Sequence, residues 1–274
     1  MNPLGASDNL LALARSALLD ALIAIGAHRN SVIVVGAQAI YLHTRSAPVA
    51  VAEATKDSDL AIDVRTLAND PLIEEAMRGA GFHSDAPSGQ PGAWLSPLGI
   101  PVDLMVPAAL AGKGRRSVSA PPHASRAFRR AVGLEAAVVD NAMMPIPSID
   151  PTDRRSIEAR VAGPAALLVA KLHKLGERHE SAPERLVDKD AYDIYRLLRA
   201  IPTDVIATSL RTLRDDDLAG DVTRSALTHL QELFGSASSQ GSFMAGRAEQ
   251  FIGDPAGVSA TCAVLSSDLF AALS

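Results

Sequence analysis

Cysteine is almost absent from this sequence, with Cys262 the only one among 274 residues. A single thiol forms no disulfide within the chain and cannot supply the several cysteines of a typical structural zinc site. The N-terminal segment lacks the basic residues of a signal peptide, and the apolar stretch after it is interrupted by Arg15 and Asp20. These absences predict a cytoplasmic protein with neither a disulfide framework nor a membrane span.

Lysine is also scarce. Of 26 basic residues only five are lysines, and these are Lys56, Lys113, Lys171, Lys174 and Lys189. Where arginine predominates so strongly, a lysine that remains indicates a position at which arginine does not serve equally well. The formal net charge of −5 argues against a protein whose whole surface binds nucleic acid, but it leaves room for a local basic patch.

Several common catalytic and metal-binding motifs are missing as well. The Gly-Lys-Gly at 112–114 lacks the spacing of a phosphate-binding Walker loop, and the acids that begin at Asp57 lack the glycine and glutamate of an EF-hand. The sequence has neither an HExxH metalloprotease motif nor a GxSxG nucleophile elbow. Other residues must therefore carry any chemistry.

The hydrophobic pattern predicts an α+β fold, with a mixed sheet and flanking helices followed by a helical C-terminal domain. In the first half we predict helices at 8–27, 37–43 and 70–79, a loop or hairpin tip at 84–92, and strands at 31–35, 60–64, 93–95, 100–106, 134–140 and 156–161. In the second half the period is helical, with helices at 164–178, 184–199, 203–214, 221–234 and 259–272. A cluster of prolines predicts a boundary between domains 1–160 and 161–274.

Three aspartates are the main candidates for a functional site. Asp57 and Asp59 lie two residues apart at the start of a predicted strand, so their side chains point to the same face. Adjacent carboxylates repel each other unless a cation lies between them. Asp103 lies between Val102 and Leu104 in another predicted strand. Burial of a charged side chain there costs free energy, so the acid calls for a functional explanation. If the two strands are neighbours, the carboxylates converge into a site for Mg²⁺ or Mn²⁺, which suits in-line phosphoryl or nucleotidyl transfer.

The turn after the predicted strand 31–35 is a second candidate feature. Gly36 ends this strand and begins a predicted helix, and such a helix N-terminus offers backbone N–H groups and a positive dipole end to a phosphate. Because glycine has no Cβ, phosphate oxygens can approach the backbone closely. The turn and the aspartates together predict a binding site for a triphosphate and a cation.

This order of elements resembles that of the DNA polymerase β-like nucleotidyltransferase superfamily. The shared features are a strand, a glycine turn and a helix, then Asp-x-Asp on the next strand and a single Asp on a later one. In the second half, Lys171-Leu172-His173-Lys174, Arg178 and Asp188-Lys189-Asp190-Ala191-Tyr192-Asp193 resemble the lysine and Lys-Asp-x-x-Asp elements of the AbiEii/MenT toxin-type nucleotidyltransferases. The resemblance covers residues 30–200 of the chain.

The resemblance implies a Mg²⁺-dependent (or Mn²⁺-dependent) enzyme that moves a nucleotide from an NTP to a hydroxyl of RNA (tRNA) or of a protein. It implies that Asp57, Asp59 and Asp103 hold the metal. It also implies that the triphosphate lies against three consecutive residues, which are Gly36, Ala37 and Gln38.

For the helical half, the resemblance implies catalytic roles for Lys171 and Asp190. Lys174 and Asp193 are implied to contribute to the nucleotide pocket. The family also suggests that the chain is the toxin of a toxin–antitoxin pair, with an antitoxin protein as its partner.

Two features depart from the family pattern. Gly36 is followed by Ala37 where the family usually has glycine or serine, and an insertion at 46–54 lengthens the interval to Asp57. They favour one alternative, a catalytically inactive binding or regulatory protein with a nucleotidyltransferase fold. Another alternative is a DXD-type glycosyltransferase, which requires neither Asp103 nor a lysine from the second half. The acids and lysines are also consistent with ordinary solvated surfaces.

A basic segment completes the set of candidates. Residues 104–134 contain no acid but six basic residues, which are Lys113, Arg115, Arg116, Arg126, Arg129 and Arg130. Such a segment attracts phosphate, so 113–130 is a predicted contact for an RNA acceptor. A plain flexible loop is the alternative.

Overall fold

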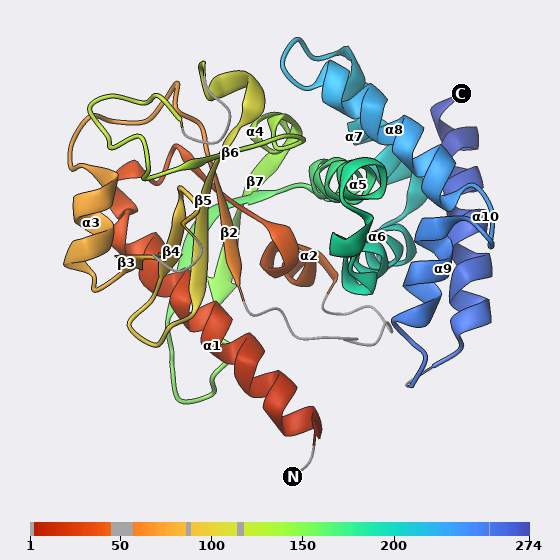
Figure 1. Cartoon of the computed structure of the whole chain (residues 1–274), viewed down its shortest axis with the longest axis horizontal. Coiled ribbons are helices and arrows are strands. Elements are labelled where there is room, and N and C mark those ends of the chain that lie inside the picture. Colours follow the sequence, from red (N-terminus) through yellow and green to blue (C-terminus); the bar gives the residue numbers. More distant parts are fainter. Residues whose placement is uncertain (1–2, 45–56, 86–88, 114–117, 252) are drawn as a thin grey trace. The chain divides into compact units, whose positions relative to one another are not determined.

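The computed structural model describes residues 3–44, 57–85, 89–113, 118–251 and 253–274 of the chain (Figure 1). The insertion at 46–54 lies outside the described residues, as do Lys56, Arg115 and Arg116. The described part forms an N-terminal mixed sheet of eight strands with helices, followed by a C-terminal region of six α-helices. The predicted α+β class is therefore confirmed at this level.

The sheet is built from short strands. They are β1 Val32–Val35, β2 Ser58–Ile62, β3 His83–Ser84, β4 Ala93–Leu95, β5 Pro101–Pro107, β6 Arg129–Ala131, β7 Asn141–Pro147 and β8 Ser156–Ala162. Their order across the sheet is β3-β4-β5-β2-β1-β8-β7, and β6 pairs with β5. Strand β2 runs antiparallel to β1 and parallel to β5, which confirms that the two strands carrying the predicted acids are neighbours.

The α-helices follow the predicted second-half pattern closely. They are α1 Pro3–Ala24, α2 Gly36–Thr44, α3 Ile73–Gly79, α4 Glu135–Val139, α5 Pro164–Ser181, α6 Asp188–Ala200, α7 Thr203–Asp215, α8 Gly220–Phe234, α9 Gln240–Arg247 and α10 Pro255–Leu273. Short 3₁₀ helices lie at Gly26–His28, Ala108–Leu110 and Pro183–Arg185.

The chain divides into two compact units. The sheet unit comprises Met1–Ala39, Ala54–Leu134 and Asn141–Ala162, and the helical unit comprises Ile40–Glu53, Glu135–Asp140 and Gly163–Ser274. Each unit has a core of its own. In the sheet unit α1 packs across β2, β5 and β8, and in the helical unit α5 packs against α6 and α8.

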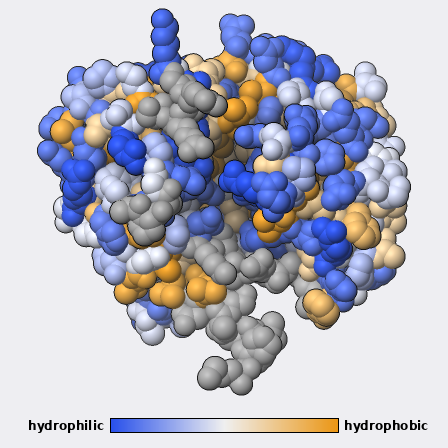
Figure 2. Space-filling model, in the orientation of Figure 1, coloured by the Kyte–Doolittle hydropathy of each residue, from blue (hydrophilic) through white to orange (hydrophobic). Residues whose placement is uncertain are grey.

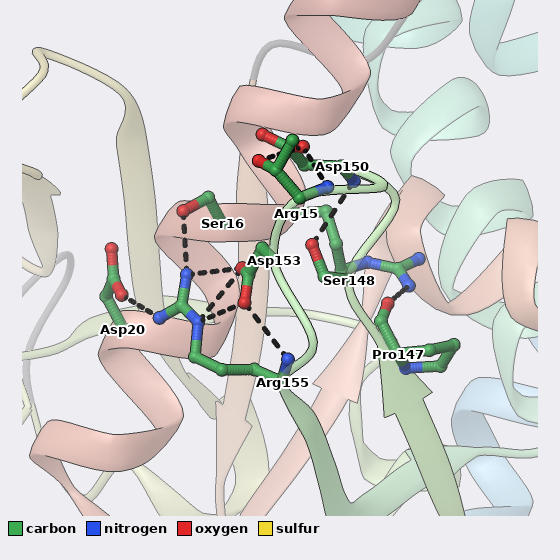
Figure 3. A network of polar contacts seen from close by, with 9 residues as sticks. Arg15, Ser16, Asp20, Pro147, Ser148, Asp150, Asp153 and Arg155 are labelled. Carbon is green, nitrogen blue, oxygen red and sulfur yellow. Dashed lines mark hydrogen bonds and ion pairs between the residues drawn. The ribbon is translucent and has the colours of Figure 1, made fainter.

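A polar network joins α1 to the turn between β7 and β8 within the sheet unit (Figure 3). The Arg155 guanidinium donates to Asp153, to Asp20 and to the hydroxyl of Ser16, both of the latter on α1. These charge-assisted bonds hold the pKa of Asp153 down at about 2. The network fixes the helix on the face of the sheet that it covers.

The predicted strand at 134–140 is wrong, because these residues form α4. Its sequence, Leu-Glu-Ala-Ala-Val-Val-Asp, is a short buried apolar run, and such a run does not distinguish strand from helix by its periodicity. Strand β7 was not predicted, because Pro145 and Pro147 argue against a strand. β7 lies at the edge of the sheet, where proline is tolerated.

Helix α9 was not predicted either, because its sequence is rich in glycine and serine. Its glycines serve close packing instead. A Cβ at Gly241 would lie 2.6 Å from the ring of Phe234, and one at Gly246 would lie 2.4 Å from the carbonyl oxygen of Pro255. The small residues let α9 approach α8 and α10.

Helix α10 is long and apolar enough to cross a membrane by length and composition, and 28% of its apolar window is buried in the structure. This is weak evidence in either direction, so the predicted localisation stays a prediction. In the view of Figure 2, hydrophilic residues predominate on the surface and apolar residues form separate patches among them.

Candidate functional site

Asp59 and Asp103 are direct neighbours across two parallel strands. Asp59 on β2 is in register with Asp103 on β5, so the two side chains stand on the same face of the sheet. The preceding residue, Ser58, donates its hydroxyl to the carbonyl of Ala14 on α1, at 3.0 Å. Because side chains alternate along a strand, the two aspartates lie on the face opposite α1. Asp103 is not an edge residue, since β5 has neighbours on both sides.

The Gly36 turn lies directly beneath Asp59. Gly36 follows β1, begins α2 and has a φ of +67°, a backbone conformation that favours glycine. Val35, the residue before it, is in register with Asp59. A Cβ added to Gly36 would lie 2.1 Å from Oδ2 of Asp59. Only glycine allows the carboxylate and the turn to be this close.

The residues after Gly36 are buried. Ala37 is 5% exposed and Gln38 is 1% exposed. The side-chain Oε1 of Gln38 accepts a hydrogen bond from Nε of Arg15 at 2.8 Å, and the same guanidinium donates to the carbonyl of Pro147. Figure 3 shows Arg15 reaching from α1 to Pro147. Gln38 therefore ties the start of α2 to α1 and to the end of β7. A contact between Gln38 and a phosphate stays a prediction.

Asp103 is surrounded by further charges that the sequence did not reveal. Its Oδ2 accepts a hydrogen bond from Nη2 of Arg129 at 2.5 Å. Burial raises the pKa of Asp103 above its usual value. The cation of Arg129 opposes this, while the negative charges of Asp57 and Asp85 raise the pKa further. Asp57 is thus close enough to Asp103 to influence its charge, as the sequence predicted.

Asp85 joins this group through the register of the hairpin between β3 and β4. Its backbone N–H donates to the carbonyl of Ala93, and Ala93 is in register with Asp103. Asp85, Ala93, Asp103 and Asp59 therefore form one row across the sheet, on one face. The sequence does not predict that Asp85 lies in this row. The two strands of this hairpin are joined by a long loop, so their register depends on how the strands pair and not on a short turn motif.

The donor set suits a hard divalent cation, since carboxylate oxygens are the ligands that Mg²⁺ and Mn²⁺ prefer. As the side chains stand, however, no three His, Cys, Asp or Glu residues within the described ranges are grouped to hold a metal ion. Asp103 is instead directed to Arg129. The residue types and the strand register fit a cation.

The predicted residues of the second half form a buried network within the helical unit. Nζ of Lys171 on α5 donates to Asp190 at 2.9 Å and to Asp193 at 2.7 Å, both on α6. Asp190 also accepts from Lys174 and from Arg178, each at 2.9 Å. Positions 171, 174 and 178 share one helix face, so the three cations of α5 meet the acids of α6 together.

Burial opposes the charge of Lys171, but Asp193 and Asp190 outweigh it and raise the pKa of the ammonium group above its usual value. The pKa of Asp190 is lowered in turn, because Lys171 and Lys174 outweigh the cost of its burial. Lys171 is 7% exposed, so its interpretation as a solvated helix face is wrong. Asp193 also accepts from Lys189 at 3.2 Å.

Tyr41 and Thr44, at the end of α2, extend this network. The ammonium of Lys189 lies 5.7 Å from the centre of the Tyr41 ring, and the guanidinium carbon of Arg196 lies 5.3 Å from it. Arg196 also donates to the hydroxyl of Thr44 at 2.6 Å. Helix α6 thus binds the last turn of α2 through cations.

The basic segment is partly engaged with its own chain. Arg126 is exposed and donates to the carbonyl of Gly89, Arg130 donates to the carbonyl of Gly112, and Arg129 contacts Asp103. Lys113 is exposed. The structure thus gives Arg129 a role beside the acids, and contact of this segment with RNA stays a prediction.

The predicted site residues are divided between the two units. The three aspartates and Gly36, Ala37 and Gln38 belong to the sheet unit, and the lysines and acids of α5 and α6 belong to the helical unit. Comparison of the chain with protein-family models, with curated proteins and with solved structures gives no match.

Proposed function

We propose that the chain is a Mg²⁺- or Mn²⁺-dependent nucleotidyltransferase that transfers a nucleotide from an NTP to a hydroxyl group of RNA or of a protein. The observation that carries this proposal is the register of Asp59 with Asp103, with the Asp59 carboxylate resting on the Gly36 turn. Two acids side by side, next to the glycine that begins a helix, are the combination that a cation and a triphosphate require.

In this proposal Asp57, Asp59 and Asp103 hold the cation. When bound, the cation supplies charge stabilisation to the triphosphate and lowers the pKa of the acceptor hydroxyl. Gly36 keeps the backbone open beside Asp59, and the hydrogen bond from Arg15 to Gln38 keeps the first turn of α2 in position. The strand register and the anchored turn thus fix the backbone positions of these residues, and such positioning is what transfer chemistry needs.

The network of the helical unit supports a role in phosphate binding. Two carboxylates, Asp190 and Asp193, accept from four cations, which leaves an excess of positive charge around them. We assign the phosphate contact to Lys174, because its side chain is 45% exposed while that of Lys171 is 9% exposed. Lys171 and Asp190 then act by holding this charged face together.

The nature of the acceptor and the biological role rest on the family resemblance. RNA, with a tRNA end as one example, is the proposed acceptor, and the exposed side chains of Lys113 and Arg126 are the proposed contacts. A role as the toxin of a toxin–antitoxin pair, with an antitoxin protein as partner, is part of the same proposal.

The proposal is tested by incubating the chain with Mn²⁺ or Mg²⁺, each labelled NTP in turn, and total RNA or a protein extract. We expect label to be transferred to RNA or protein, and we expect Asp59→Asn and Asp103→Asn to abolish the transfer. Glu158→Gln removes an exposed carboxylate from β8 of the same sheet and serves as the matched control. Equal transfer by the Asp59→Asn variant and the unaltered chain would contradict the proposal.

A second candidate is a nucleotidyltransferase-fold protein that binds a nucleotide without turnover. Ala37 favours it, because the residue after the turn has no hydroxyl to offer a phosphate. The ion pair between Asp103 and Arg129 favours it as well. This candidate predicts that the unaltered chain binds an NTP, measured by calorimetry, but transfers no label to any acceptor.

A further inference from the structure

Arg129 is held rigidly beside the acids by its backbone. It begins β6 and is in register with Met105 on β5, two residues beyond Asp103, so its side chain shares the face of the aspartates. Gly92 makes this approach possible, because a Cβ there would lie 2.5 Å from the backbone nitrogen of Arg129. The preceding Phe128 is completely buried. The fold therefore sets the backbone position of Arg129 and the face on which its side chain stands.

The charge balance gives this guanidinium a purpose. Asp103 is largely buried and has Asp57 and Asp85 as negatively charged neighbours, so its own negative charge is unfavourable without a cation. Nη2 of Arg129 supplies that positive charge at 2.5 Å from Oδ2 of Asp103. A divalent ion bound to Asp103 would supply it too, and a guanidinium and a divalent ion on the same carboxylate would repel each other.

Arg129 also retains unused donor capacity. Its Nε is buried and has no hydrogen-bond partner within the described part of the chain. A guanidinium has five N–H donors in a fixed planar fork and cannot lose its charge. On leaving Asp103 it therefore keeps its charge and its donors and can bind another oxygen.

We infer that Arg129 takes the place of the divalent cation at Asp103 when no cation is bound, and that the two compete for this carboxylate. This inference rests on the proposed function, because it takes Asp103 as a ligand of the cation. It adds a positioning residue that neither the aspartates nor the family pattern includes. Cation binding is then coupled to the release of Arg129.

Competition is tested by measuring the affinity for Mn²⁺ alone, by isothermal titration calorimetry, without nucleotide or acceptor. We expect Arg129→Gln to tighten Mn²⁺ binding about tenfold, because the variant lacks the charge-assisted bond that the ion must replace. Arg129→Lys keeps the charge but loses the planar fork, so we expect an intermediate affinity. Fluorescence of the buried Trp94 verifies the fold, since its Nε1 donates to the carbonyl of Ala127, two residues before Arg129.

Arg126→Gln is the matched control, since it removes the same charge from the same segment and Arg126 contacts Gly89 rather than an acid. Competition predicts unchanged Mn²⁺ affinity in this variant. Equal tightening by both glutamine variants would show a general effect of charge and would overturn the inference. Equal affinities of the unaltered chain and Arg129→Gln would overturn it while leaving the metal site of the proposed function intact. If no variant binds Mn²⁺, both proposals fail.

Discussion

The two charged clusters of this chain are balanced in opposite ways. In the sheet unit, Asp103 has three other aspartates near it, Asp57, Asp59 and Asp85, and burial raises its pKa together with the charges of Asp57 and Asp85. In the helical unit, Asp190 accepts hydrogen bonds from three cations, and its pKa is lowered. The first cluster sets one guanidinium, that of Arg129, against several aspartates, whereas the second sets four cations against Asp190 and Asp193. The same residue types thus form an acid-rich cluster in one unit and a cation-rich cluster in the other.

Among the variants that test this comparison, Lys171→Met has the largest expected effect on stability. We expect the free energy of unfolding of the helical unit to fall by about 3 kcal/mol, because two buried carboxylates lose the ammonium between them. Lys174→Met is the control, since its side chain is 45% exposed and such a pair contributes about 0–1 kcal/mol. Urea unfolding followed by circular dichroism at the helix band measures both. Similar losses in the two variants would contradict the assignment of Lys171 as the buried centre.

Gly36→Ala tests the sheet unit with the next largest effect. The left-handed φ of Gly36 costs an alanine about 1–3 kcal/mol, and its Cβ also displaces Asp59. Gly99→Ala is the matched control, because Gly99 has a φ of +74° but nothing within 4 Å of an added Cβ. Urea unfolding followed by Trp94 fluorescence reports on this unit. We expect both variants to lose stability, but only Gly36→Ala to lose Mn²⁺ affinity.

The dependence of the helical unit's stability on acidic pH is expected to show a smaller effect. The folded-state pKa of Asp190 lies below its unfolded value, so this carboxylate stabilises the helical unit at pH values above about 4. That stabilisation is lost as the pH falls through the folded-state pKa. In Lys171→Met the pKa of Asp190 is less depressed, so acidification removes less stability than in the unaltered chain. Urea midpoints between neutral and acidic pH measure this difference, and equal losses in the two proteins would contradict it.

The smallest expected effect is on the reactivity of the Cys262 thiol, and it is measured without a substitution. Burial raises the pKa of its thiol to about 12. Since the thiolate is the reactive form, we expect almost no alkylation by iodoacetamide at pH 8 in the folded chain and rapid alkylation in urea. Mass spectrometry follows the reaction. Because Cys262 lies in α10, its alkylation also reports unfolding of the helical unit alone, as Trp94 does for the sheet unit.

The sequence predicted those features of the molecule that depend on local pattern. Most helices and strands follow from hydrophobic periodicity, whereas the pairing of the acid-bearing strands was only a condition of the predicted site, which the structure meets. Prediction from the sequence failed for β7 and α9, because their formation depends on their position in the tertiary structure. Pro145 and Pro147 are compatible with a strand only at the edge of the sheet, and the glycines of α9 are understood only through the side chains that they accommodate.

The candidate site was predictable to the same extent. Asp57, Asp59, Asp103 and Gly36 were identified from residue type and spacing. Asp85 and Arg129 were not identified. Asp85 lies near Asp103 because of the pairing of β3, β4 and β5, and Arg129 does so because β6 pairs with β5 after a long connection. Register depends on the packing of whole strands, so no local pattern contains it.

The two ends of the sheet have a consequence for how this protein behaves at high concentration. An exposed edge strand with a full row of N–H donors recruits strands from other molecules. Here one end is β3, which has two residues, and the other is β7, where Pro145 and Pro147 have no N–H to donate. These two ends thus resist sheet extension, and the remaining edge strand in the described part of the chain, β6, has only three residues to offer.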